Sequence, residues 1–422
     1  MMITPSEFMY YLGAGAYFTL MFLSTTMFAD ILPLSNHTLR NAIRFTCYGF
    51  ILVKMMLAET FTLKRVAVYV VIALPILMCY HVTGYIYQLD MFMLIVGARG
   101  FRANRIVNLY FFMSMLLIAV TLIALAGGVI ENRTFTRTDS DVIRNSVGFI
   151  YPTDFGARLF YTSLAFCALV GKRYNLAMLG IFCVISALLT VFCDARLDAA
   201  LIVIVGILFY LNAKTRFFKR KWIERMLIVC VPFFFFLSYF VTMSYKKGPF
   251  FKYLDRILSK RLMYGYYNVW YTGIHPFGRH IYQQGHGALN YSSWAGYNFV
   301  DCGYLQALLE YGYVLMFLVL LMFVLITFTA IRRGQHHLAI IIFMIGLSSC
   351  VDHHFLEFWY DPFPLLIFSV IPYAPGYRKK GAEKVEEPAA EAEQIQKDIP
   401  APKGLSHSHD VWGQLNMIQK KY

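Results

Sequence analysis

The chain has 422 residues, of which 59% are hydrophobic and only 15% are charged. Soluble domains carry about 25% charged residues, so this composition excludes an ordinary soluble globular protein and predicts an integral membrane protein. The net charge of +14 is explained first by the enrichment of Lys and Arg in cytoplasmic loops, so we expect no nucleic acid partner.

Twelve apolar segments predict an all-α, polytopic bundle of about 12 transmembrane helices, because about 20 mostly apolar residues cross a bilayer. The first lacks a preceding basic region and is too long for a signal-peptide core, so we expect it to remain uncleaved. The fourth is interrupted by Gln88 and Asp90. The segments lie near residues 8–29, 41–58, 66–81, 84–98, 106–130, 156–171, 175–193, 197–212, 225–243, 303–331, 338–351 and 359–374.

Basic residues predict the orientation. If the twelve helices alternate, the basic groups within 64–65, 99–105, 172–173, 214–225, 332–333 and 378–380 share one side, which the positive-inside rule makes the cytoplasm. Both termini are then cytoplasmic, and one large extracytoplasmic loop spans residues 244–302. Residues 1–375 form the membrane domain. Residues 376–422 have too little apolar content to fold alone, which predicts a disordered cytoplasmic tail.

Lys54, Glu59 and Asp90 lie at membrane depth, and we expect them to pair structurally without chemistry. Other basic residues fall on the side that the bias disfavours, which an anionic ligand would explain. Arg144 precedes a turn-rich stretch with Gly148 and Pro152, although a solvated loop would also fit.

Arg196 lies in a very short turn between two apolar helices. It is either a fixed cation for a ligand or the partner of Asp194 or Asp198 in an ion pair, or it extends to the interface. Arg261 follows Lys260 in a segment with helical apolar spacing. The pair can hold phosphate groups, or lie on the polar face of a surface helix, and these interpretations are compatible.

Asp301 lies where the large loop meets a long apolar helix, so it is the candidate general base, with helix capping as the competing role. Glu310 points to the opposite face of a continuous helix. Further along, His353 and Glu357 share a helix face, but a third metal ligand is not evident. Interfacial hydrogen bonding is the favoured interpretation for His353 and His354.

Together these stretches resemble the Wzy-type polysaccharide repeat-unit polymerases, in the superfamily that includes O-antigen ligases. The resemblance covers roughly residues 100–372 and depends on the shared order of four motifs. They are Arg144 through Asp154, Asp194-Ala195-Arg196, Leu258 through Leu262 followed by Pro276-Phe277-Gly278, and Asp301-Cys302-Gly303-Tyr304-Leu305 through Gly312. Ligases usually have His-Asn where this chain has Asp301-Cys302, which favours a polymerase over a ligase.

The resemblance implies a metal-independent, inverting glycosyltransferase without a cofactor, in the bacterial cytoplasmic membrane. It would join undecaprenyl-pyrophosphate-linked oligosaccharide repeat units on the outer face, with membrane lipid around it and a flippase and a chain-length regulator as further partners. The implied catalytic residues are Asp301, Arg196 and Arg261, and the implied substrate-binding residues are Arg144, Arg279, His286, Asp352 and His354. The alternatives are a ligase with another acceptor, or a transporter or flippase of lipid-linked oligosaccharide.

Overall fold

A computed structural model describes residues 4–58, 61–137, 140–285, 297–375 and 377. The chain divides into two units, Met1–Pro375 and Gly376–Tyr422, and the elements below all belong to the first. The first half contains α1 (Pro5–Leu23), α2 (Phe28–Ile31), α3 (His37–Ala58), α4 (Leu63–Thr83), α5 (Tyr87–Gly97), α6 (Ala103–Ala126), β1 (Thr134–Arg137), β2 (Ser140–Asn145), α7 (Pro152–Val170) and η1 (Gly171–Arg173).

The second half contains α8 (Leu176–Cys193), α9 (Arg196–Lys214), η2 (Phe217–Lys219), α10 (Lys221–Met243), α11 (Pro249–Ile257), α12 (Arg261–Thr272), α13 (Gly303–Arg332), α14 (His336–Ser348), η3 (His354–Leu356) and η4 (Phe363–Phe368). Within the described residues, seven helices are long and apolar enough to cross a membrane: α3, α4, α6, α8, α9, α10 and α13. The prediction of a mostly helical, multi-pass membrane protein is therefore confirmed.

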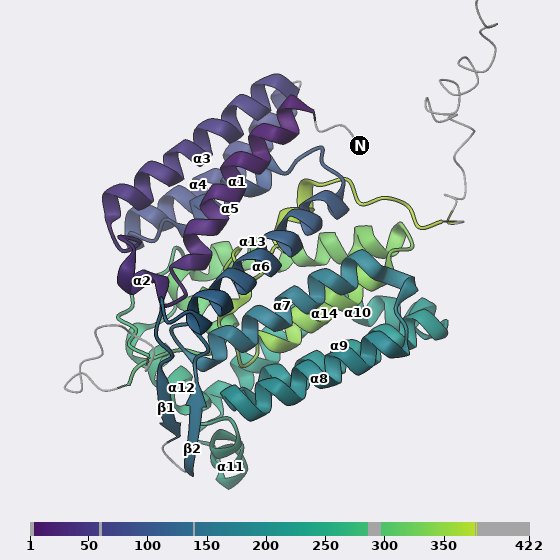
Figure 1. Cartoon of the computed structure of the whole chain (residues 1–422). Helices are drawn as coiled ribbons and strands as arrows, with labels where there is room; N and C mark the ends of the chain where they lie inside the picture. Colours follow the sequence, from purple (N-terminus) through teal and green to yellow (C-terminus); the bar gives the residue numbers. More distant parts are fainter. Residues whose placement is uncertain (1–3, 59–60, 138–139, 286–296, 376, 378–422) are drawn as a thin grey trace, which may run out of the picture. The chain divides into compact units, whose positions relative to one another are not determined.

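Two groups of helices make up the bundle (Figure 1). In the first group, α1 packs on α3, and α5 packs on both α3 and α4. In the second group, α8 packs on α9, and α10 packs on α13 and α14. Helix α6 contacts both α1 and α7, while α13 contacts both α4 and α10, so these two helices join the groups. Large apolar side chains such as Phe112, Phe236 and Phe317 are more than 60% exposed, which suits helices that face lipid.

Three features of the fold differ from the sequence prediction. Residues 359–374 are not a transmembrane α-helix: they form the short 3-10 helix η4 and extended backbone inside the bundle. This segment is tied near one end to α7, where Arg158 donates to the Trp359 carbonyl, and near the other to the start of α6, where Val370 pairs with Arg102. An antiparallel hairpin, β1–β2, precedes α7. The stretch 244–302, predicted as a loop with one helical segment around Arg261, contains two helices, α11 and α12.

Helix α13 is broken at Gly312, whose φ of 82° lies in the left-handed region. Residues 275–279 fill the break with backbone hydrogen bonds: Arg279 N–H donates to Leu309 O at 3.0 Å, and Val314 N–H donates to Pro276 O at 3.1 Å. A Cβ atom on Gly278 would lie 2.0 Å from the Glu310 carbonyl oxygen, so only glycine fits there. Irregular backbone is tolerated at membrane depth where protein groups satisfy it, as they do here.

Of the polar residues expected to pair at membrane depth, Asp90 has its partners outside that set. Asp90 pairs with Arg44, at 2.8 Å from its Nε, and accepts hydrogen bonds from Tyr17 and Tyr48. Lys54 donates to the Arg99 carbonyl at 2.7 Å. The remaining member of that prediction, Glu59, is outside the described residues.

Candidate functional site

The end of the bundle at which α13 begins carries the candidate site and is called the Asp301 end below. The residue at the helix N-cap is Cys302, which makes no side-chain capping bond, so Asp301 lies just outside the cap. The first helical N–H group, that of Gly303, donates to the carbonyls of Ser349 and Asp352, both at 3.0 Å. The helix start is thus held by the 349–352 turn, and the capping role considered for Asp301 is not the one observed.

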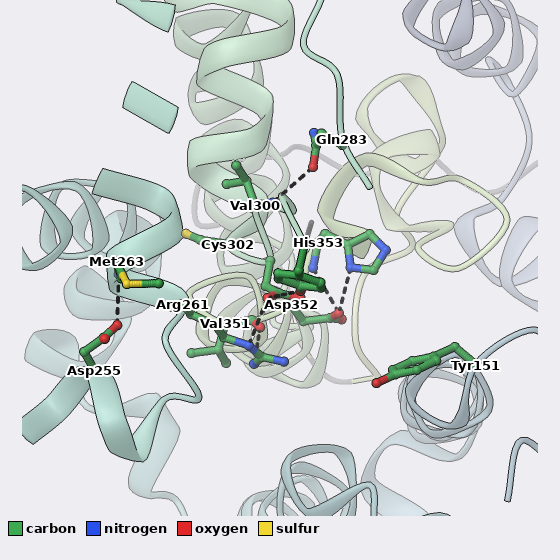
Figure 2. Close-up of polar contacts among 12 residues, drawn as sticks. Tyr151, Asp255, Arg261, Met263, Gln283, Val300, Cys302, Val351, Asp352 and His353 are labelled. Atoms are coloured by element: carbon green, nitrogen blue, oxygen red, sulfur yellow. Dashed lines mark hydrogen bonds and ion pairs between the residues drawn. The ribbon is translucent and has the colours of Figure 1, made fainter. Parts of the chain in front are cut away.

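Arg261 connects Asp301 to the same turn. Its Nε lies 3.4 Å from Asp301 Oδ2, and its Nη1 donates to the Val351 carbonyl at 2.5 Å. The side chains of Arg261 and Asp301 are 25% and 18% exposed, so the pair is accessible without being on the open surface. Figure 2 shows the guanidinium against the turn that carries Val351 and Asp352.

The local sequence explains the placement of Arg261. It is the first residue of α12, and it follows Lys260, whose φ of 64° makes a sharp turn after α11. The Asp255 carboxylate accepts a hydrogen bond from the Met263 N–H at 2.9 Å, which ties the first turn of α12 to α11 (Figure 2). The amphipathic segment predicted around Arg261 is therefore two helices with the arginine at their junction.

A group of two histidines and two carboxylates lies beside this pair. Asp352 Oδ1 is 3.7 Å from His353 Nδ1 and 3.8 Å from His354 Nε2. The other ring nitrogen of His354, Nδ1, is 2.6 Å from Glu357 Oε2. Residues 354–356 form a 3-10 turn, η3, so His353 and Glu357 do not share the α-helical face that their spacing predicted.

Burial shifts the ionisation of this group. Burial lowers the pKa of His353 to about 3 and that of His354 to about 4, so both imidazoles are neutral near pH 7. Burial raises the pKa of Asp352, against the opposing effects of His354 and Arg261, and it also raises the pKa of Glu357. A general base works best with a pKa near the working pH, so these two imidazoles are weak bases and Asp301 remains the candidate base.

Tyr297 extends the site toward the hairpin. Its hydroxyl donates to Asp301 Oδ2 at 3.2 Å, and burial together with that carboxylate raises the pKa of Tyr297. Tyr297 is also within electrostatic reach of Tyr151, whose hydroxyl accepts a hydrogen bond from Arg144 Nη1 at 3.2 Å. Arg144 donates further to the Cys193 carbonyl at 3.2 Å. The stretch around Arg144 therefore lies near the stretch around Asp301.

The other predicted site residues lie as follows. Arg196 is 63% exposed and forms, within the described part of the chain, a single ion pair, to Asp194 at 2.6 Å. Asp198, two residues further along α9, is buried and interacts electrostatically with Asp352 and Arg261, so Arg196 is at the Asp301 end. Arg279 is exposed, with its backbone bonded to α13. His286 is outside the described residues.

The sequence interpretation missed two contributors. Tyr297 was not among the predicted site residues, although its position four residues before Asp301 was the available signal. Arg158 is fully buried, with its guanidinium 4.1 Å from the Phe22 ring centre and 3.7 Å from that of Tyr360. Its position inside a predicted helix indicated burial. In the structure it packs between two aromatic rings and bonds the Trp359 carbonyl.

No family model, no curated protein and no solved structure matches this chain.

Proposed function

We propose that this chain is a metal-independent, inverting glycosyltransferase that polymerises lipid-linked oligosaccharide repeat units. The observation that carries the proposal is the Arg261–Asp301 pair, 3.4 Å apart and partly exposed, beside Asp352 and neutral His354 at one end of an apolar bundle. The pair combines a fixed cation with a carboxylate, which are the two groups that glycosyl transfer from a pyrophosphate requires.

In the proposed reaction, the acceptor hydroxyl oxygen attacks the anomeric carbon of the donor glycan, and the bond from that carbon to the pyrophosphate oxygen breaks. Negative charge develops on the leaving pyrophosphate, where the Arg261 guanidinium stabilises it. Asp301 accepts the proton of the acceptor hydroxyl, with His354 and Asp352 as the neighbouring groups that can relay it. Arg261 Nε, 3.4 Å from Asp301 Oδ2, holds the carboxylate in place for this step.

The exposed cations at the same end have a supporting role in this proposal. Arg196, at 63% exposure, and Arg279 can attract the anionic substrate, and Arg144 orients Tyr151 toward Tyr297. An exposed arginine paired with one carboxylate is a weaker clamp than one held by several contacts. We therefore assign the larger share of leaving-group stabilisation to Arg261.

The proposal includes an orientation and a location. The loops opposite the Asp301 end carry the basic groups at Arg99, Lys172–Arg173 and Arg332–Arg333, which the positive-inside rule assigns to the cytoplasm. The site then faces outward in the bacterial cytoplasmic membrane, with about twelve membrane crossings and cytoplasmic termini. The donor and acceptor are both undecaprenyl-pyrophosphate-linked, and a flippase and a chain-length regulator are its expected partners.

The test is an assay of the purified full-length protein in nanodiscs with a synthetic undecaprenyl-pyrophosphate-linked repeat unit as the only substrate. The proposal predicts a ladder of products that differ by one repeat unit. Transfer to a second, unrelated acceptor without a ladder would indicate a ligase instead. Protein in liposomes that moves the labelled lipid between leaflets, but makes no ladder, would indicate a transporter and contradict the proposal.

A further inference from the structure

Three consecutive residues at the Asp301 end place metal-ligand atoms close together. Asp352, His353 and His354 each offer one such atom, and the three atoms lie within 4.8 Å of one another. Two imidazoles and a carboxylate are a ligand set that favours Zn²⁺ and related transition metals over Mg²⁺ or Ca²⁺, which prefer oxygen ligands.

The distances are close to those of a bound site. In a tetrahedral Zn²⁺ site with bonds of about 2.1 Å, neighbouring ligand atoms lie about 3.4 Å apart. Here Asp352 Oδ1 is 3.7 Å from His353 Nδ1 and 3.8 Å from His354 Nε2. The three atoms all lie within 4.8 Å of one another, so rotation of the side chains is needed to bring them to one ion, with a fourth position left open.

A neighbouring carboxylate prepares His354 as a ligand. His354 is 3% exposed, and its Nδ1 faces Glu357 Oε2 at 2.6 Å. If Nδ1 carries the proton, it donates to Glu357 and leaves the lone pair of Nε2 directed at Asp352. A carboxylate that accepts from the second nitrogen of a histidine ligand is the usual support of zinc sites.

The charge and hydrogen bonding of Asp352 also suit a cation. Its Oδ2 atom is buried and has no hydrogen-bond partner in the part of the chain that the structure describes. One positive group nearby, Arg261, is neutralised in part by Asp301 and is held by the Val351 carbonyl. Asp352, Asp301 and Glu357 together bring three carboxyl groups to this region, where Arg158 is a second positive group.

We propose that Asp352, His353 and His354 form a binding site for a divalent transition-metal ion such as Zn²⁺, and that an ion bound there inhibits the enzyme. The metal site itself is independent of the proposed glycosyl transfer; the inhibition rests on it. An ion would occupy Asp352 Oδ1 and the lone pair of His354, so neither group could take part in proton transfer.

The binding test uses Co²⁺ as a spectroscopic probe on the full-length protein in nanodiscs. We expect a visible absorption band of tetrahedral Co²⁺ that Zn²⁺ displaces. His353→Phe keeps a ring against Phe299 and removes one ligand, and His354→Ala removes another; both should abolish the band. His280→Phe is the matched control, since that ring packs on Tyr85 outside the cluster, and it should keep the band.

Glu357→Gln should lower the Zn²⁺ affinity about 10–100-fold, because only the support of His354 changes. Thermal unfolding of His353→Phe, which lies outside the proposed machinery, shows whether the variant is folded. The metal site is overturned if wild-type protein gives no band, or if folded His353→Phe binds Co²⁺ as the wild type does.

The inhibition is tested in the polymer-ladder assay. Zn²⁺ should suppress the wild-type ladder, and His353→Phe should require at least about tenfold more Zn²⁺ for the same effect. Equal inhibition of both proteins would overturn the inhibitory role. If the protein binds the metal at this cluster but forms no ladder under any condition, the metal site is supported. That result would contradict only the proposed glycosyl transfer.

Discussion

Two ionic clusters inside this bundle are built in contrasting ways. In the first, the Asp90 carboxylate is fully buried and accepts from Arg44, Tyr17 and Tyr48, on helices α1 and α3. In the second, at the Asp301 end, the Arg261 and Asp352 side chains are 25% and 14% exposed, and Asp352 Oδ2 has no hydrogen-bond partner among the described residues. We call the Asp90 cluster the closed cluster, because its carboxylate is bonded to protein groups. We call the cluster at the Asp301 end the open cluster, because it is partly exposed and keeps a carboxylate oxygen for a ligand.

The closed cluster should carry the largest stability effect. Arg44→Met leaves Asp90 buried without its cation, which should cost about 3–5 kcal/mol of unfolding free energy. Arg261→Met should cost no more than about 1 kcal/mol, because that pair is partly solvated. Unfolding of both variants in nanodiscs measures the difference. The double variant Arg44→Met/Asp90→Leu should recover much of the loss, and equal losses for the two single variants would remove the contrast.

The break in α13 supports the open cluster, and Gly278→Ala tests it. The new Cβ would meet the Glu310 carbonyl, and φ is 74° there, so we expect a loss of about 3 kcal/mol from clash and strain together. Gly100→Ala is the matched control, with φ of 80° and open space around it, and should cost only about 1–2 kcal/mol. Similar melting temperatures for the two variants would show that the close approach at Gly278 is unimportant.

Within the open cluster, Tyr297→Phe should act on the reaction more than on the fold. It removes the hydrogen bond to Asp301 Oδ2, which should lower the rate of ladder formation about tenfold. Tyr271→Phe, an exposed ring stacked on Tyr267, should leave the rate unchanged. A wild-type rate for Tyr297→Phe would exclude this hydroxyl from the site.

Acidification should lower the stability of the folded protein by a smaller amount than the substitutions above. The pKa of His354 is lowered to about 4 in the folded protein, so the unfolded chain binds the extra proton between about pH 6.5 and pH 4. The stability that the neutral imidazole contributes is present above pH 6.5 and is lost as the pH falls through that window. The melting temperature of the wild type should therefore fall more steeply over this range than that of His354→Gln. Parallel curves would contradict a buried neutral His354.

The sequence predicted the long apolar helices well, because an apolar run of about 20 residues is a specific signal of a membrane-spanning helix. It failed for residues 359–374, since hydrophobicity alone does not distinguish a helix from a buried 3-10 and extended segment. It also read residues 303–331 as one helix, because the break at Gly312 depends on Pro276 and Gly278, which are far away along the chain.

For the site, the sequence identified Arg261 and Asp301 as candidates but not as partners, because residues 40 apart meet only through tertiary structure. It also expected Arg196 to act equally with Arg261. The short turn around Arg196 indicated either a ligand clamp or an ion pair with a neighbour, and only the structure shows the pair with Asp194. The Asp352–His353–His354 cluster was missed because its ligand spacing requires a turn in place of the helix that was assumed.

The most direct test of the central proposal compares two conservative substitutions in the polymer-ladder assay. Arg261→Lys keeps the charge but loses the planar group that spans Asp301 and the Val351 carbonyl, and it should abolish the ladder while the protein stays folded. Arg196→Lys, at an exposed position, should only shorten the ladder or slow its growth. A wild-type ladder from folded Arg261→Lys would contradict the assignment of this site.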